Sequence, residues 1–200
     1  MHAFRLAIIT LVINLLAACA QRPPPQVLDQ PLHQQQLASI INWQLNGRLA
    51  FKSPEDKFSA TLNWQQQNQQ FELALTSFIG STLMEMSGQP GLVTLDVDDQ
   101  RYLDSNASAL LRRITGWQIP VNQLPQWIKG QALANDMVEY DEFGRIQRLL
   151  PGCSECAQWE IRYNGFQRVG EVWLPGDIRL VNLDDPRNSI KIRVNEWRMR

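Results

Sequence analysis

The chain has 200 residues, with 19 basic and 20 acidic side chains and a formal net charge of −1 at neutral pH. Nothing in this charge balance suggests nucleic acid, so we expect no nucleic-acid partner. The length suffices for one domain with a substantial hydrophobic core.

The first residues are typical of a secretory leader. His2 and Arg5 precede an apolar run over residues 6–18, which is too short to remain as a membrane anchor. The run ends in Leu16-Ala17-Ala18-Cys19, and this pattern resembles the site that bacterial lipoprotein signal peptidase cleaves. It predicts a leader over residues 1–18 and lipid attachment at Cys19. A plain signal peptide cleaved at Ala18 or Ala20 is the alternative.

Lipid at Cys19 would hold the protein on a membrane, because several acyl chains make detachment negligible. Aspartate after the cysteine resembles an inner-membrane retention signal, and this chain has Ala20 there. We therefore expect a lipid-anchored, periplasm-facing protein of the outer membrane. Three consecutive prolines within residues 19–30 favour an extended tether, although an arm packed on the domain is also possible.

Residues 31–200 are expected to form one domain, whose first element is a helix from about residue 30 to residue 41. Apolar and polar residues then alternate, which is typical of an antiparallel sheet with one apolar face. This pattern predicts strands at 43–52, 58–65, 71–76, 82–87, 92–97 and 101–103.

A helical insertion interrupts the strands. One helix is predicted over 107–114, with an apolar face of spacing i, i+3, i+4, i+7 and a stop at Gly116. A second is predicted from about 120 to 129, with a kink at Pro125. Strands return at 145–150, 158–163, 171–174, 177–183 and 190–197.

A sheet of this size curls because its strands twist, and its apolar face must then be covered. Large side chains are predicted on that face at Trp43, Phe51, Phe58, Trp64 and Phe71. A lid of short helices could leave an apolar cavity there, although alternation alone favours a fully packed core.

Several short patterns occur in a fixed order along the chain. They are Trp43-x-Leu45-x-Gly47-Arg48-Leu49-Ala50, Asn63-Trp64-Gln65, Leu73-x-Leu75 followed by Gly80-Ser81-Thr82, Leu124-x-x-Trp127-Ile128-x-Gly130, and Ile192-x-x-x-x-Trp197. The ordered set resembles the LolB family of outer-membrane lipoprotein receptors, and the resemblance runs from about residue 30 to residue 200.

The resemblance implies a mainly β (α+β) fold, an incompletely closed antiparallel β-barrel with a helical lid over an apolar cavity. It also implies a monomer that accepts lipoprotein cargo from the periplasmic carrier LolA, binds the acyl chains and inserts the cargo into outer-membrane lipid. We expect the acyl-chain cavity to involve Trp43, Phe51, Phe58, Trp64, Phe71, Leu73, Leu110 and Trp127.

The loop Ser77-Phe78-Ile79-Gly80-Ser81 places two large apolar residues between two predicted strands, where polar turn residues are usual. Exposed, they would indicate a membrane or partner contact; folding back onto the sheet is the alternative. The resemblance implies a membrane-insertion loop made of Phe78, Ile79 and Gly80. Phe78 stands where the family pattern has proline.

The residues that carry enzyme chemistry are scarce. The histidines are His2, in the predicted leader, and His33, and no nucleophile or orienting acid accompanies His33. A phosphate-binding GxxxxGK[ST] loop is absent, so we expect no use of ATP, no cofactor and no enzymatic activity.

Cys153 and Cys156 form an even pair in a protein expected to be exported, which favours a local disulfide. A zinc site would need two further ligands, so no metal is expected. A lipid-anchored envelope scaffold with a filled β-core is the alternative function, since it would share the leader, the tether and the sheet.

Overall fold

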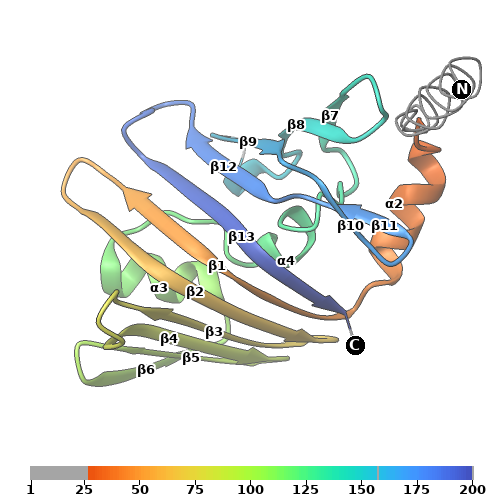
Figure 1. Ribbon diagram of the computed structural model, residues 1–200. Coiled ribbons are helices and arrows are strands. Elements are labelled where there is room, and N and C mark those ends of the chain that lie inside the picture. Colours follow the sequence, from red (N-terminus) through yellow and green to blue (C-terminus); the bar gives the residue numbers. More distant parts are fainter. Residues whose placement is uncertain (1–26, 157, 200) are drawn as a thin grey trace, which may run out of the picture.

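The computed structural model describes residues 27–156 and 158–199. The predicted leader and the lipidation site Cys19 lie outside these residues. The described chain forms one large antiparallel sheet, a small two-stranded ribbon and a few short helices (Figure 1).

The strands of the large sheet are β1 (Asn42–Lys52), β2 (Lys57–Gln67), β3 (Gln70–Thr76), β4 (Thr82–Gln89), β5 (Leu92–Val97), β6 (Gln100–Asp104), β7 (Met137–Tyr140), β8 (Ile146–Leu150), β9 (Trp159–Asn164), β12 (Asp177–Asn182) and β13 (Ser189–Met199). They pair in the order β6-β5-β4-β3-β2-β1-β13-β12-β9-β8-β7. In the described residues the edge strands β6 and β7 do not pair with each other, so the sheet curls without closing. This confirms the expected open antiparallel barrel.

Strands β1 and β13 form the centre of the sheet, and a register shift at Asn46 and Gly47 bends it there. A Cβ atom on Gly47 would lie 2.4 Å from the carbonyl oxygen of Arg193, so only glycine fits this close approach of the two backbones. Such an irregularity increases the local twist and helps to curl the sheet.

The concave face carries the core. Trp43, Leu45, Leu62 and Trp64 are almost fully buried, as the alternation predicts. The ring of Trp43 packs 5.3 Å from that of Trp64 and 5.4 Å from that of Trp197, which joins three adjacent strands through one aromatic cluster.

Helix α3 (Ala107–Thr115) lies on this side of the sheet, against β5 and β6 (Figure 1). Gly116 ends the helix in the left-handed conformation, as predicted. The helix begins after Asn106, whose side chain accepts a hydrogen bond from the Ala109 amide. The expected helix over 120–129 is wrong in extent. Turns occupy most of this segment, and α4 spans only Leu124–Trp127, because prolines at 120 and 125 remove amide donors from it.

Helix α2 (Gln30–Ser39) packs at the far end of the molecule against the ribbon of β10 (Gln167–Val169) and β11 (Val172–Leu174) (Figure 1). The amide of Trp173 donates to Nε2 of His33 over 3.1 Å. Lys129 Nζ donates to the carbonyl oxygens of Leu37 and Ile40, over 2.9 and 2.7 Å, and so satisfies the end of α2. Burial lowers the pKa of Lys129 to about 8.

Two short strands and a disulfide complete the later part of the fold. The alternation analysis missed β7 and β10, which have four and three residues. The short 3₁₀ helix η1 (Ser154–Cys156) carries the predicted cysteine pair, and Cys153 and Cys156 are joined by a disulfide with Cα atoms 5.4 Å apart. Among the described residues, no helix is both long and apolar enough to cross a membrane.

Candidate functional site

An apolar cavity of about 70 Å³ lies between the concave face of the sheet and the helical segment. Strands β1 to β4, β12 and β13 contribute one wall, and α3, α4 and the chain between them contribute the other. The lining consists of Leu49, Phe51, Phe58, Leu62, Trp64, Leu73, Leu75, Met84, Met86, Leu111, Trp117, Ile119, Val121, Leu124, Leu180, Ile190 and Ile192.

No residue of this lining carries a charge, and the exposed surface inside the cavity is entirely apolar. Such a site cannot orient a polar substrate or stabilise a developing charge. It can accommodate hydrocarbon, whose transfer out of water is favourable at about 0.8 kcal/mol per CH₂. Among residues 27–156 and 158–199 there is also no cluster of metal-ligating side chains.

Trp117 closes one end of the cavity. Its ring lies 4.4 Å from the ring of Phe51 and 5.3 Å from that of Phe58, and its Nε1 donates to Asp56 Oδ2 over 3.3 Å. Trp117 belongs to the irregular chain that follows α3, whereas the other three residues belong to β1, β2 and the turn between them. The contact therefore ties the helical segment to the sheet.

Four of the residues expected at the cavity do line it: Phe51, Phe58, Trp64 and Leu73. Three others are buried elsewhere in the core. Trp43 packs against Trp64 and Trp197, Leu110 lies on the face of α3 that meets the sheet, and Trp127 donates from Nε1 to Asp136 Oδ2 over 2.9 Å.

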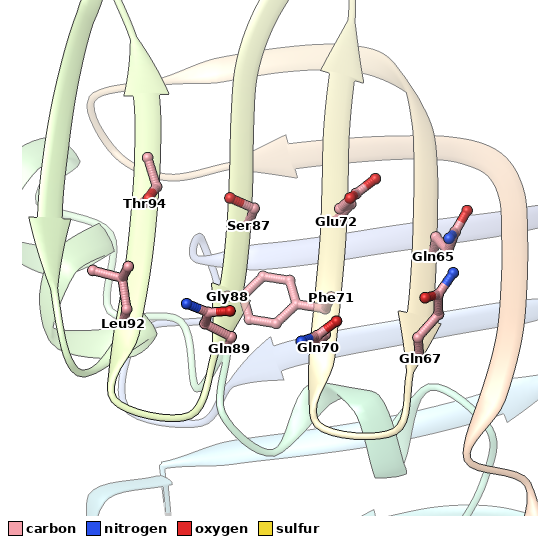
Figure 2. Close-up of a pocket in the computed structure, with 10 residues that line it drawn as sticks. All are labelled: Gln65, Gln67, Gln70, Phe71, Glu72, Ser87, Gly88, Gln89, Leu92 and Thr94. Atoms are coloured by element: carbon pink, nitrogen blue, oxygen red, sulfur yellow. The ribbon is translucent and has the colours of Figure 1, made fainter.

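The eighth residue, Phe71, lies near the ends of β2 to β5, beside a polar pocket (Figure 2). Its ring lies against Gly88 of the neighbouring strand, at a position where a Cβ atom would be 2.2 Å from Phe71 Cε1. The glycine leaves room for the aromatic ring, so Phe71 stabilises the strand pair rather than the cavity.

Most lid residues of the cavity lining were not predicted from the sequence. Met84 and Met86 could have been found, because they alternate within a predicted strand. Trp117 and Ile119 lie in a stretch without helix or strand, where no periodicity indicates which side chains turn inward.

The loop between β3 and β4 holds its apolar residues in solvent. The side chain of Phe78 is 97% exposed and that of Ile79 is 73% exposed, so the folded-back alternative is wrong. The Gly80 amide donates to the Ser77 carbonyl and the Ser77 amide to the Ser81 carbonyl, over 3.0 and 2.8 Å. Gly80 has a φ of +89°, which suits a three-residue hairpin loop. The turn itself therefore presents the two apolar residues.

Comparisons with known proteins agree with this architecture. The sequence profile of the family described as "Outer membrane lipoprotein LolB" matches residues 41–197. The outer-membrane lipoprotein LolB of Shewanella frigidimarina is 37% identical over 195 residues, which cover 97% of this chain and 93% of that protein. The outer-membrane lipoprotein LolB of Pseudoalteromonas translucida is 34% identical over 190 residues, which cover 95% and 92%.

A LolA superfamily protein from Nitrosomonas europaea has a similar fold, with a TM-score of 0.58 over 86% of this chain and 94% of that one. The two sequences are only 10% identical, so this likeness concerns the fold alone. The profile match and the two relatives show that the chain belongs to the LolB family of outer-membrane lipoproteins.

Proposed function

We propose that this outer-membrane lipoprotein accepts lipoproteins from the periplasmic carrier LolA and inserts them into the outer membrane without ATP. The observation that carries the proposal is the wholly apolar cavity beneath a helical lid. The acyl chains of the cargo are the part of a lipoprotein that such a cavity can bind. Lipid on Cys19 would keep the receptor, as a monomer, at the membrane where delivery takes place.

Acceptance requires the cavity to widen. Its volume of about 70 Å³ is well below the roughly 300–1,000 Å³ of typical ligand pockets, so an acyl chain cannot enter the closed form. The lid contributes Leu111, Trp117, Ile119, Val121 and Leu124 to the lining, and most of these lie on irregular chain or a helix of one turn. This wall can move at lower cost than the paired strands opposite it.

The direction of transfer follows from relative affinity. The chain has no phosphate-binding loop for a nucleotide, so cargo must pass from a weaker to a stronger acceptor. A tenfold preference requires only about 1.4 kcal/mol. The bilayer is the final acceptor, and the membrane-insertion residues in this proposal are Phe78 and Ile79, whose exposure at the turn before Gly80 supports that role.

The experiment is a transfer assay with LolA loaded with a lipoprotein, carried out without ATP. The receiving protein is the chain expressed from Ala20 onward, which contains every described element and lacks the anchor. The variant Ile79→Glu should accept cargo normally but deliver less of it to liposomes, because a carboxylate resists entry into lipid. Leu103→Glu is the matched control, since Leu103 is an exposed apolar residue on β6.

Failure of the unmutated chain to take up cargo, while it remains folded, would contradict the proposal. The small volume of the closed cavity would then favour the envelope scaffold with a filled core. Binding of a fluorescent fatty acid separates the two functions independently of LolA, because a receptor should bind it inside the barrel and a scaffold should not.

A further inference from the structure

The convex face of the sheet, opposite the cavity, carries a concentration of positive charge. Six exposed cations project from the adjacent strands β2, β1, β13 and β12, and we call them the basic face. They are Lys57, Arg48, Lys52, Lys191, Arg193 and Arg179. Arg198 lies near the other end of β13, where it is paired with Glu196 over 2.8 Å, and is not counted among them. The whole chain has a net charge of only −1, so this surface departs strongly from the average.

The cations oppose one another directly across the strands. Lys52 faces Lys57, Arg48 faces Arg193, and Arg179 faces Lys191. Like charges in directly opposite positions destabilise a sheet, so the arrangement is not explained by stability. In the described residues one of the six forms an ion pair, Arg193 with Asp177 over 3.3 Å. The acidic Glu55 and Asp56 lie beyond this face, in the β1–β2 turn.

The exposed loop adjoins this charge. Phe78 forms one side of a groove of about 390 Å³ whose other residues include Arg48, Lys191 and Arg193. The β3–β4 loop lies at the same end of the strands as the β1–β2 and β12–β13 connections (Figure 1). A protruding apolar tip and a set of cations therefore share one surface.

We propose that the basic face binds the phosphate groups of a phospholipid bilayer while Phe78 and Ile79 enter its acyl region. The inference rests on the proposed function and extends it, because it specifies how the molecule is oriented on the membrane during delivery. Exposed apolar side chains beside Lys and Arg are the combination that holds proteins in the interfacial layer.

The spread of the charge favours a membrane over an acidic protein partner. The cations occupy four adjacent strands, which at a spacing of about 4.8 Å span about 14 Å. Each of these strands carries one or two of the cations, so the basic face can contact several phosphate groups of a bilayer at once.

The test is flotation of the chain expressed from Ala20 onward with vesicles of phosphatidylethanolamine and phosphatidylglycerol, or of phosphatidylcholine alone. The double variant Arg48→Glu and Lys191→Glu should bind the anionic vesicles at least about 25-fold more weakly, at about fivefold per cation. The control, Arg112→Glu with Arg168→Glu, makes the same change in net charge on a helix and on the ribbon. It should bind like the unmutated chain.

Folding is checked in the same variants. Arg48→Glu places a carboxylate opposite Arg193, so the melting temperature should not fall. Anionic-vesicle binding that is unaffected by the basic-face variant, or equally reduced in both double variants, would overturn the proposal. So would unchanged vesicle binding with lost binding of LolA, which would make the face a protein-binding surface.

Uptake of cargo from loaded LolA in solution, without vesicles, separates this inference from the function on which it rests. The basic-face variant should accept cargo normally. If the unmutated chain accepts cargo but shows no binding that depends on the basic face, only the membrane-orientation inference fails. If the unmutated chain accepts no cargo, the proposed function fails.

Discussion

His33 shows how one side chain fixes the position of a helix. It is 6% exposed, and its Nε2 accepts a hydrogen bond from the Trp173 amide. Only an unprotonated Nε2 can accept this bond, so the imidazole must be neutral for the contact to form. Burial lowers the pKa of His33 below the ordinary histidine value. The only other histidine of the chain is His2, so histidine titration in the chain from Ala20 onward reports on this contact.

We expect the free energy of unfolding to decrease as the pH falls from about 7.5 to 5.5. Below about pH 6.5, the ordinary pKa of histidine, His33 is protonated in the unfolded chain but stays neutral in the folded chain. The folded state therefore loses stability as the pH falls toward the lower pKa that His33 has in the folded chain. Denaturant titrations at several pH values measure this slope. The variant His33→Gln should show a smaller dependence of the unfolding free energy on pH. Most carboxylates remain ionised between about pH 5.5 and 7.5, so they contribute little to this dependence. An unchanged slope in the variant would show that other groups cause it.

At the scale of elements, Trp117 attaches the irregular part of the helical segment to β1, β2 and the turn between them. Trp117→Ala removes the stacking on Phe51 and Phe58 and the hydrogen bond to Asp56. We expect a loss of about 1–3 kcal/mol in stability and faster uptake of a fluorescent fatty acid, because the lid opens more often. Stopped-flow fluorescence measures the uptake.

Trp173→Ala is the matched control for this prediction. Trp173 is also a half-buried tryptophan, but it lies on β11, beside α2 and away from the cavity. It should lower stability without changing the uptake rate. Equal acceleration in both variants would show that general loosening of the fold, and not release of Trp117, controls access.

At the scale of the whole molecule, a small closed cavity and a curled sheet imply that ligand binding moves the lid and leaves the sheet intact. We expect a bound fatty acid to accelerate amide hydrogen exchange over residues 107–127 while β1 and β13 keep their protection. Hydrogen exchange with mass spectrometry measures both regions in one experiment. Slower exchange over residues 107–127 would show that the ligand stabilises the closed form instead.

Membership of the LolB family agrees with the scarcity of catalytic side chains in the sequence. The chain belongs to a family of outer-membrane lipoproteins, which confirms that it is not an enzyme and places it at the outer membrane. The ordered patterns around Trp43, Trp64 and Trp127 were sufficient to indicate this family from the sequence. Two of these tryptophans, Trp43 and Trp127, pack in the core and not on the cavity, so they identify the fold more directly than the binding site.

The sequence by itself determined most of the strands, the apolar face of the sheet and the presence of two large apolar residues in the β3–β4 loop, but not β7, β10 or the exposure of that loop. These features depend on neighbours along the chain, namely period-two alternation and the residues of a single turn. Only the tertiary structure decided which apolar residues line the cavity. Alternation assigns Trp43 and Phe51 to the same face, but the curvature of the sheet and the path of the irregular lid place one in the packed core and the other at the cavity. Contacts such as Trp117 with Phe58 join residues far apart in the chain, and no local pattern encodes them.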